Sequence, residues 1–271
     1  PSVSTHCSSS SVMNRPSKDR VRQSFDRAAA TYDSAAQVQR KVCQRLAAGL
    51  PVIFTPGVIL DTGCGTGYAL RLLGERFPAS PRLGLDLAPR MLAHAKGLDY
   101  GLAGDAEHLP VKDGRVGLYW SSLALQWCDL GHALGEARRV LKTGGRLALA
   151  TLGPETFHEL RTAFAAVDGF QHTLGFLDPD AVRQRADEAG FSEVMITRER
   201  QIAHYADLKS LLHAVKAVGA NQVGDGRRTS LMGKAAWQQV EAAYEVRRDV
   251  AGLPLTYDVI YLHAAKWEAE A

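Results

Sequence analysis

The sequence lacks the features that mark several large classes of protein. No apolar run approaches the ~20 residues that a membrane-spanning helix needs. The first 14 residues are rich in serine without the apolar centre of a signal peptide, so we expect a flexible tail there. The four cysteines, Cys7, Cys43, Cys64 and Cys128, show no paired spacing. This pattern argues against a disulfide framework and a zinc site, and it favours a cytoplasmic location.

The chain also has little excess of positive over negative charge. A net charge of +3 over 271 residues is too small to predict a nucleic-acid-binding protein. The basic residues are nevertheless unevenly distributed. Residues 15–45 contain eight Lys and Arg against three Asp, and residues 209–234 contain five against one Asp. Both stretches would attract an acidic partner.

Apolar residues make up 46% of the chain, which is ample for a buried core. Short β-rich runs alternate with helical patterns, and this predicts an α/β fold with βαβ units and a mostly parallel sheet. Helices are expected at residues 68–77, 89–95 and 131–141. The expected strands, which would form a seven-stranded sheet with helices on both faces, are at residues 58–61, 82–86, 100–103, 116–121, 146–151, 193–198 and 258–265.

A glycine-rich loop follows the first expected strand. The strand ends at Asp61, and glycines stand at Gly63, Gly65 and Gly67. Because glycine adopts backbone conformations closed to other residues, such a loop can expose N–H groups to a ligand. The dinucleotide fingerprint G-x-G-x-x-G would need glycine at position 68, where Tyr68 stands. The arrangement instead resembles motif I of class I S-adenosylmethionine-dependent methyltransferases, although a purely structural turn is the alternative.

Two further acidic residues follow expected strands. Asp86 lies 25 positions after Asp61, where an acidic residue accepts hydrogen bonds from a ribose diol. The alternative is a strand-end residue or a helix cap. Asp105, followed by Ala106, is placed to accept a hydrogen bond from an adenine amino group, or else is a turn residue that bonds its own backbone.

Other residues complete the expected cofactor site. Leu87 and Met91 would flank the adenine face, or else belong to the core. Asp61 would act indirectly, by ordering the glycine loop or through water. In order and spacing these segments match motifs I to III of class I methyltransferases. The resemblance implies a Rossmann-like fold and S-adenosyl-L-methionine as the methyl donor, with no metal.

We divide the chain into five segments. A long stretch between the last two strands reads as helical with a break near residues 219–226, and a crossover of this length predicts a cap rather than a plain loop. The segments are a tail (1–14), an N-terminal helical lid (15–50), the S-adenosylmethionine-binding core (51–205), the helical cap (206–250) and the final strand (251–271).

Segments outside the cofactor motifs resemble one family, the malonyl-[acyl-carrier-protein] O-methyltransferases of biotin synthesis. The resembling stretches are Ser-Phe-Asp-Arg-Ala-Ala-Ala-Thr-Tyr at 24–32, Ser-Leu-Ala-Leu-Gln-Trp-Cys at 122–128, Lys-Ala-Val-Gly-Ala at 216–220 with Gly-Arg at 226–227, and Pro-Leu-Thr-Tyr at 254–257. The chain departs from the usual motif I at Thr62, where an aliphatic residue is common; this change leaves the glycines intact.

This resemblance implies methylation of the free carboxylate of a malonyl thioester on acyl carrier protein. A carboxylate with a pKa of about 4 is already ionised at pH 7, so no catalytic base is expected. Arg161 is the predicted partner of that carboxylate, or else a solvated helix residue. Tyr32, Gln126 and Trp127 are the other predicted acceptor-pocket residues, although Trp127 could equally belong to the core.

The acidic surface of the carrier protein would meet the basic stretches. We predict a docking patch of Lys209, Lys216, Arg227 and Arg228, supported by Arg20 and Arg22, with an ordinary solvated charged face as the alternative. Three other functions remain open at this point. They are a class I methyltransferase for another small acceptor, such as a free acid or a quinone-type carbon, a silent methyltransferase-like subunit that activates a partner, and an RNA methyltransferase.

Overall fold

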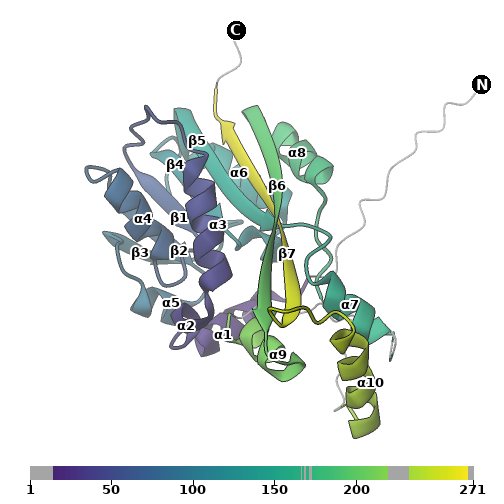
Figure 1. Ribbon diagram of the computed structural model, residues 1–271. Coiled ribbons are helices and arrows are strands. Elements are labelled where there is room, and N and C mark those ends of the chain that lie inside the picture. The colour runs from purple at the N-terminus through teal and green to yellow at the C-terminus, as the bar shows by residue number, and fades with distance from the viewer. Residues whose placement is uncertain (1–14, 166, 168, 171–172, 219–231, 268–271) are drawn as a thin grey trace, which may run out of the picture.

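The computed structural model describes residues 15–165, 167, 169–170, 173–218 and 232–267. Its centre is a seven-stranded sheet in the order β3-β2-β1-β4-β5-β7-β6 (Figure 1). All neighbouring strands are parallel except β7, which is antiparallel to both β5 and β6. The predicted mostly parallel, Rossmann-like sheet is confirmed. The strands are β1 (Ile59–Thr62), β2 (Arg82–Asp86), β3 (Tyr100–Ala103), β4 (Val116–Ser122), β5 (Leu141–Leu152), β6 (Ser192–Tyr205) and β7 (Leu253–Ala265).

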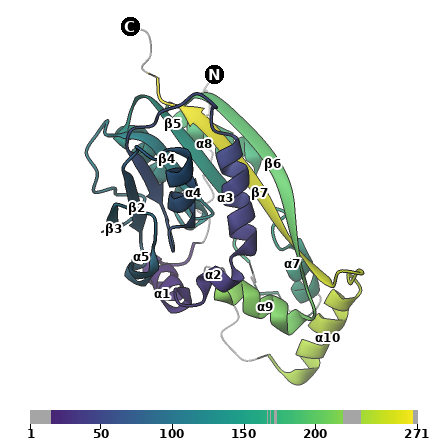
Figure 2. The same ribbon diagram turned by 60° about the vertical axis from the view of Figure 1, so that its left-hand side comes forward.

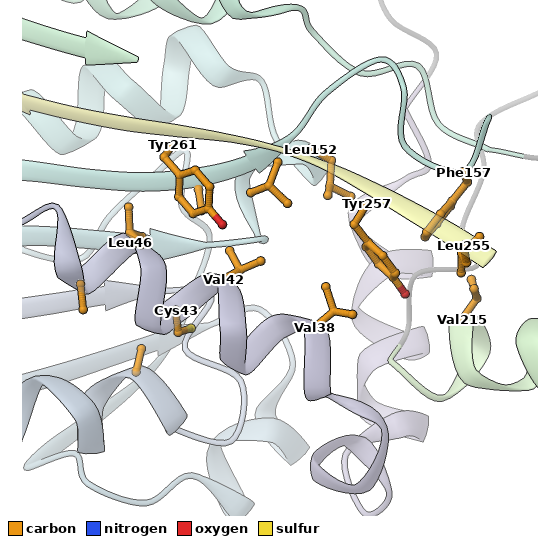
Figure 3. Close-up of a cluster of buried hydrophobic side chains, with 14 of the residues drawn as sticks. Val38, Val42, Cys43, Leu46, Leu152, Phe157, Val215, Leu255, Tyr257 and Tyr261 are labelled. Atoms are coloured by element: carbon orange, nitrogen blue, oxygen red, sulfur yellow. The ribbon is translucent and has the colours of Figure 1, made fainter. Parts of the chain in front are cut away.

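Helices cover both faces of the sheet because successive strand side chains point to opposite faces. In β1, Ile59 packs into one hydrophobic cluster and Leu60 into the other. Side chains of α3 (Gln37–Ala48) and α4 (Tyr68–Arg76) cover the first face. Side chains of α6 (Leu130–Val140) and α8 (Pro179–Glu188) cover the second. Figure 3 shows Val42 and Leu46 of α3 facing Tyr261 of β7 in the first cluster.

The predicted N-terminal lid divides into three helices with different surroundings. Helix α3 packs on the sheet as part of the core. The shorter helices α1 (Lys18–Ala28) and α2 (Tyr32–Ala35) lie instead beside α5 (Pro89–His94) and α9 (Leu208–Ala217), respectively (Figure 2). Asp26 of α1 accepts a hydrogen bond from the N–H of Arg90 at 3.0 Å, which ties α1 to the start of α5. Of the three helices of the predicted lid, only α1 and α2 thus lie apart from the face of the sheet.

Strands β6 and β7 are longer than the sequence pattern predicted. They pair continuously from Met195 opposite His263 to Tyr205 opposite Leu253. The prediction placed this strand at residues 193–198. In the structure β6 is an edge strand whose side chains alternate between half-buried and exposed positions, so charges are tolerated there. The extension forms a two-stranded arm that leaves the body of the sheet (Figure 2).

The arm carries the described part of the cap. Helix α9 begins with a capping box between Asp207 and Ser210, and it buries Leu211 and Val215 against the core. Helix α10 (Lys234–Glu245) buries Val240 and Tyr244, and it packs on α7 (His158–Ala165). The predicted helical break at 219–226 lies outside the described residues. Within the described part of the chain, no helix is long and apolar enough to cross a membrane.

Candidate functional site

The glycine loop connects the end of β1 to the start of α4. Gly63, Gly65 and Gly67 have φ angles of +75°, +53° and +83°, a region that residues with a Cβ rarely adopt. A Cβ on Gly63 would lie 2.2 Å from the Cβ of Ala124, and one on Gly67 would lie 2.1 Å from a main-chain oxygen. A Cβ on Gly65 would meet nothing closer than the Tyr32 ring, at 4.0 Å. Packing therefore requires glycine at two of the positions, whereas Gly65 leaves open space.

Asp86 ends β2 beside this loop. Its carboxylate oxygens accept hydrogen bonds from the N–H groups of Gly65 and Ala88, each at 2.8 Å. Burial raises the pKa of Asp86 to about 6, in spite of these two N–H donors, which act to lower it. Each carboxylate oxygen can accept more than one hydrogen bond, so the predicted bond to a ribose diol remains possible. The bond to Ala88 also stabilises the turn before α5, but Asp86 is not the helix cap of the alternative, since Ala88 is the N-cap of α5 and no side chain caps that helix.

Asp61 lies within β1, directly before the loop. Asp61 is only 2% exposed to solvent. Burial raises the pKa of Asp61 well above its usual value, and the nearby carboxylate of Asp86 raises it further. Asp61 and Ser122, at the end of β4, line one small pocket together with Gly63 and Gly65. The indirect role predicted for Asp61 stays a prediction.

Asp105 follows β3 and is held by the lid. The ammonium of Lys18, in α1, contacts the Asp105 carboxylate and lies 2.8 Å from Glu107 Oε1. Burial acts to raise the pKa of Asp105, but the Lys18 ammonium and the Glu107 N–H outweigh it, so the pKa lies below its usual value. The bond from the Glu107 N–H, at 3.0 Å, is the local turn bond that the alternative expected. Asp105 is thus an ionised acceptor that also forms a turn.

The same cluster contains potential metal ligands. Ligand atoms of Asp105, Glu107 and Cys128 all lie within 4.8 Å of one another. The ammonium of Lys18 bridges the two carboxylates of this cluster and offsets one of their two negative charges. Lys18 thus ties α1 to the loop after β3, and the expectation of a metal-free site stays a prediction.

Most of the predicted cofactor residues line one pocket at the carboxyl ends of the strands. The pocket encloses about 710 Å³ including its open mouth. The small pocket next to it shares Tyr32, Gly63, Gly65 and Ser122 with the larger one. Gly67 is instead the residue before the first turn of α4. The predicted residues that line the larger pocket are Tyr32, Gly63, Gly65, Asp86, Leu87, Met91, Asp105, Ala106 and Trp127.

Gln126 and Trp127 lie in a short 3₁₀ helix, η1 (Leu125–Trp127), that follows β4. Trp127 lines both the cofactor pocket and a neighbouring, mostly apolar pocket of about 720 Å³ that also contains Gln126. The Trp127 ring packs edge-to-face on Phe25 at a centroid distance of 5.9 Å, so it is both core and pocket wall. Trp127 Nε1 and Gln126 Oε1 are buried without a hydrogen-bond partner among the described residues. Buried polar groups of this kind normally bind water or a ligand.

Arg161 lies apart from these acceptor-pocket residues. Its guanidinium donates hydrogen bonds to the main-chain oxygens of Thr156 and Pro154, the latter at 2.6 Å. Its neighbours Phe157 and Leu160 are among the residues that line the apolar pocket, whereas Arg161 itself is not. The binding of the malonyl carboxylate by Arg161 stays a prediction, and it would require the guanidinium to leave these carbonyl groups.

The predicted docking residues are only partly described. Lys209 and Lys216 are exposed on α9 and line a groove between the lid and the cap. Arg227 and Arg228 lie outside the described residues. Arg22 forms an ion pair with Asp19 at 3.2 Å on the surface of α1, the helix that also contains Arg20.

Two residues of the site were missed in the sequence. Lys18 lies 87 positions before Asp105, and no motif links the two. Ser122 could have been found, because ligands bind at the carboxyl ends of parallel strands and Ser122 ends β4. Its hydroxyl is buried without a partner among the described residues, and it lines both halves of the cofactor cleft.

Known proteins share both the sequence and the fold of this chain. A family model described as a methyltransferase domain matches residues 60–149, which run from β1 into β5. A structure of Haemonchus contortus phosphoethanolamine N-methyltransferase 2 with S-adenosylhomocysteine has a TM-score of 0.56 at 15% identity, covering 92% of this chain and 60% of the other. That likeness shows the shared fold. A bifunctional biotin biosynthesis protein BioHC from Cellvibrio japonicus is 37% identical over 92% of this chain and 50% of its own length.

A malonyl-[acyl-carrier protein] O-methyltransferase from Dechloromonas aromatica is 59% identical over 252 residues. The match covers 93% of this chain and 96% of the relative, and so includes the lid, the core and the cap. The chain belongs to the malonyl-[acyl-carrier protein] O-methyltransferase family, within the class I methyltransferases.

Proposed function

We propose that the protein transfers a methyl group from S-adenosyl-L-methionine to the free carboxylate of a malonyl thioester carried by acyl carrier protein. The product is a malonyl methyl ester, which primes the synthesis of the pimeloyl chain of biotin. The observation that carries this proposal is the 59% identity, over 93% of the chain, to a relative named for this substrate and reaction. The protein is accordingly a carboxyl O-methyltransferase.

The residues of the cleft fit S-adenosyl-L-methionine. Gly65 leaves a space that a side chain would fill, and the buried hydroxyl of Ser122 lacks a partner among the described residues. Asp86 would accept hydrogen bonds from the ribose diol and Asp105 from the adenine amino group, while Met91 would lie against the base. When bound, the cofactor supplies a methyl group on a positively charged sulfur.

The site needs to orient its acceptor rather than deprotonate it. A malonyl carboxylate is ionised at pH 7, so an oxygen lone pair is already available to form the new bond. The carbon–sulfur bond breaks as the carbon–oxygen bond forms, and the departing sulfur keeps the bonding electrons. The protein contributes by aligning the oxygen, carbon and sulfur atoms and by excluding water from the carboxylate. The apolar side chains around Trp127 and Leu152 are consistent with such exclusion.

Trp127 Nε1 is the donor that we assign to the acceptor. It is buried, it has no partner among the described residues, and its ring separates the cofactor pocket from the apolar pocket. Its N–H can hold one carboxylate oxygen while the other oxygen attacks. A Trp127→Phe variant keeps an aromatic ring but loses the donor. We expect turnover of malonyl-carrier protein to fall about 10- to 150-fold, the value of one hydrogen bond to a charged group, with unchanged binding of S-adenosylhomocysteine.

One assay tests the function directly. The protein is incubated with S-adenosyl-L-methionine and malonyl-carrier protein, and the carrier is examined by intact mass. We expect one added methyl group that alkaline hydrolysis removes, because the product is an ester. Turnover of a free carboxylic acid in place of the carrier-bound thioester would instead support a class I methyltransferase for another small acceptor. Binding of the cofactor without any turnover would support a silent subunit.

Two further parts of the proposal concern Arg161 and the setting of the reaction. An Arg161→Ala variant that methylates the malonyl thioester at the wild-type rate would exclude Arg161 as the carboxylate partner.

We propose acyl carrier protein as the macromolecular partner, with the exposed Lys209 and Lys216 among its contacts. The cytoplasmic location expected from the unpaired cysteines is part of the same proposal.

A further inference from the structure

A large groove lies between the lid and the cap. One wall comes from α1, α2 and α3, and the other from the end of β6 and from α9. Helices α2 and α9 lie side by side next to it (Figure 2). The groove encloses about 2350 Å³ including its open mouth. Its size and position suit a long, thin ligand that reaches the site from the surface.

The groove is lined by positive charge. Arg27 and Lys41 stand on the lid wall, and Lys209 and Lys216 stand on the cap wall, all four exposed. Within the described part of the chain, no carboxylate forms an ion pair with any of these four. The only carboxylate of the described lining, Asp207, accepts the N–H of Ser210 at 2.7 Å as the N-cap of α9. His213 adds one more group that can donate a hydrogen bond to an anion, whereas His204 Nε2 is already paired with the Asp249 carboxylate at 3.1 Å.

The inner end of the groove approaches the methyl-transfer centre. Val38 and Tyr205 line the groove, and the Tyr205 hydroxyl lies near that of Tyr257. Thr31 also lines the groove, and its neighbour in the chain, Tyr32, lines both parts of the cofactor cleft. Figure 3 shows the Tyr257 hydroxyl on the side of the sheet where Val38 lies, at the start of α3. A chain lying in the groove would thus point its end at Tyr32.

We propose that this basic groove, defined by Arg27, Lys41, Lys209 and Lys216, binds the phosphodiester of the phosphopantetheine arm and leads the malonyl thioester to the site. The inference rests on the proposed function. The arm carries its one negative charge near the carrier protein and is otherwise uncharged up to the malonyl group. A phosphate at the cationic mouth would place the thioester toward Tyr205 and Tyr257. Arg27 provides the paired N–H donors that phosphate accepts, and the lysines provide point charges.

The test compares three malonyl substrates with and without charge reversal of the groove. The substrates are malonyl-carrier protein, malonyl-phosphopantetheine and malonyl-pantetheine, which lacks the phosphate. The variants are Arg27→Glu, Lys41→Glu and the double variant, all on the lid wall. The matched control is Lys112→Glu, which reverses an exposed lysine in the loop before β4, outside the groove. Unchanged binding of S-adenosylhomocysteine confirms that each variant is folded.

We expect a pure KM effect that depends on the phosphate. For malonyl-phosphopantetheine and malonyl-carrier protein, KM should rise about 5-fold for each single variant and about 20-fold for the double variant, with kcat within about twofold. For malonyl-pantetheine, KM should be the same in all variants, and Lys112→Glu should match the wild type throughout. High salt should reduce the difference between wild type and double variant.

Three results would overturn the proposal. The first is an equal KM for malonyl-phosphopantetheine in the wild type and the double variant. The second is a KM increase that is just as large for malonyl-pantetheine. The third is an effect limited to the full carrier, which would make the groove a protein-docking surface instead. If the wild type methylates none of the three substrates, the proposed function fails. Titration calorimetry with free phosphopantetheine then tests the groove separately: weaker binding to the double variant than to the wild type supports phosphate binding there, and equal binding contradicts it.

Discussion

The open space at Gly65 leads to a substitution that separates folding from cofactor binding. Gly65 has a φ of +53°, and an added Cβ would lie 4.0 Å from the Tyr32 ring, which is ordinary contact. A Gly65→Ala variant should therefore lose only the cost of a left-handed alanine, about 1–2 kcal/mol of unfolding free energy. Gly65 also lines both parts of the cofactor cleft, so the new methyl group would occupy space that the cofactor needs.

The expected loss of binding follows from overpacking. Inserting one methyl group into a filled site costs about 1–3 kcal/mol, which corresponds to an affinity for S-adenosylhomocysteine that is about 5- to 150-fold weaker. Gly114→Ala is the matched control. Gly114 has a φ of +66° and no atom within 4 Å of an added Cβ, and it lies in the turn before β4, at the opposite end of the sheet. It should lose the same stability and bind S-adenosylhomocysteine as the wild type does.

Urea denaturation measures the stability of both variants, and titration calorimetry measures their binding. The reasoning would be refuted if Gly65→Ala bound S-adenosylhomocysteine as tightly as Gly114→Ala, because the cofactor would then not lie on the glycine loop. A much larger stability loss for Gly65→Ala than for Gly114→Ala would show that the space beside Tyr32 is already filled by the protein.

Three further predictions concern other parts of the molecule. Burial raises the pKa of Asp86 to about 6, so the native carboxyl keeps a proton that the unfolded chain releases near pH 4. The unfolding free energy should therefore fall by about 3 kcal/mol as the pH rises from about 4 to 6. Urea titrations should show this fall in the wild type and not in Asp86→Asn, and equal pH slopes for the two proteins would contradict the prediction. Lys18→Met removes the partly exposed bridge to Asp105 and Glu107, so stability should change by less than about 1 kcal/mol. Stopped-flow release of S-adenosylhomocysteine should become about 5-fold faster, and an unchanged rate would separate Lys18 from lid opening. Gly135 lies on the exposed face of α6, and a Cβ added there would meet no atom within 4 Å. Gly135→Ala should therefore raise the unfolding free energy by about 0.5–1 kcal/mol without changing activity. A lower unfolding free energy in this variant would contradict the prediction.

The cofactor half of the site was predictable because each part follows a strand directly. Asp86 and Asp105 stand where β2 and β3 end, and parallel strands bring those ends to one edge. The glycine loop needed only its own spacing to be found. Lys18 could not be found in this way, since its contact with Asp105 depends on how the lid folds back over the sheet.

The acceptor half depends on tertiary placement, and there the sequence was a weaker guide. Arg161 was predicted from its position after β5, but a helix places it so that the main chain near Thr156 satisfies its guanidinium. The length of β6 was underestimated because an edge strand accepts charges that would interrupt a buried one. That extra length decides where α9 and its lysines lie, so the groove could not be derived from local patterns.

The two halves also differ in what holds them in place. The glycine loop, Asp61 and Asp86 are fixed by buried strands that pair on both sides, so their geometry changes only if the sheet changes. Tyr205 and α9 stand on a two-stranded arm that lies beyond the main sheet. Substitutions in the arm or the cap can therefore shift the acceptor groove while the cofactor site keeps its shape. Selectivity for the acceptor should accordingly be easier to alter than affinity for the methyl donor.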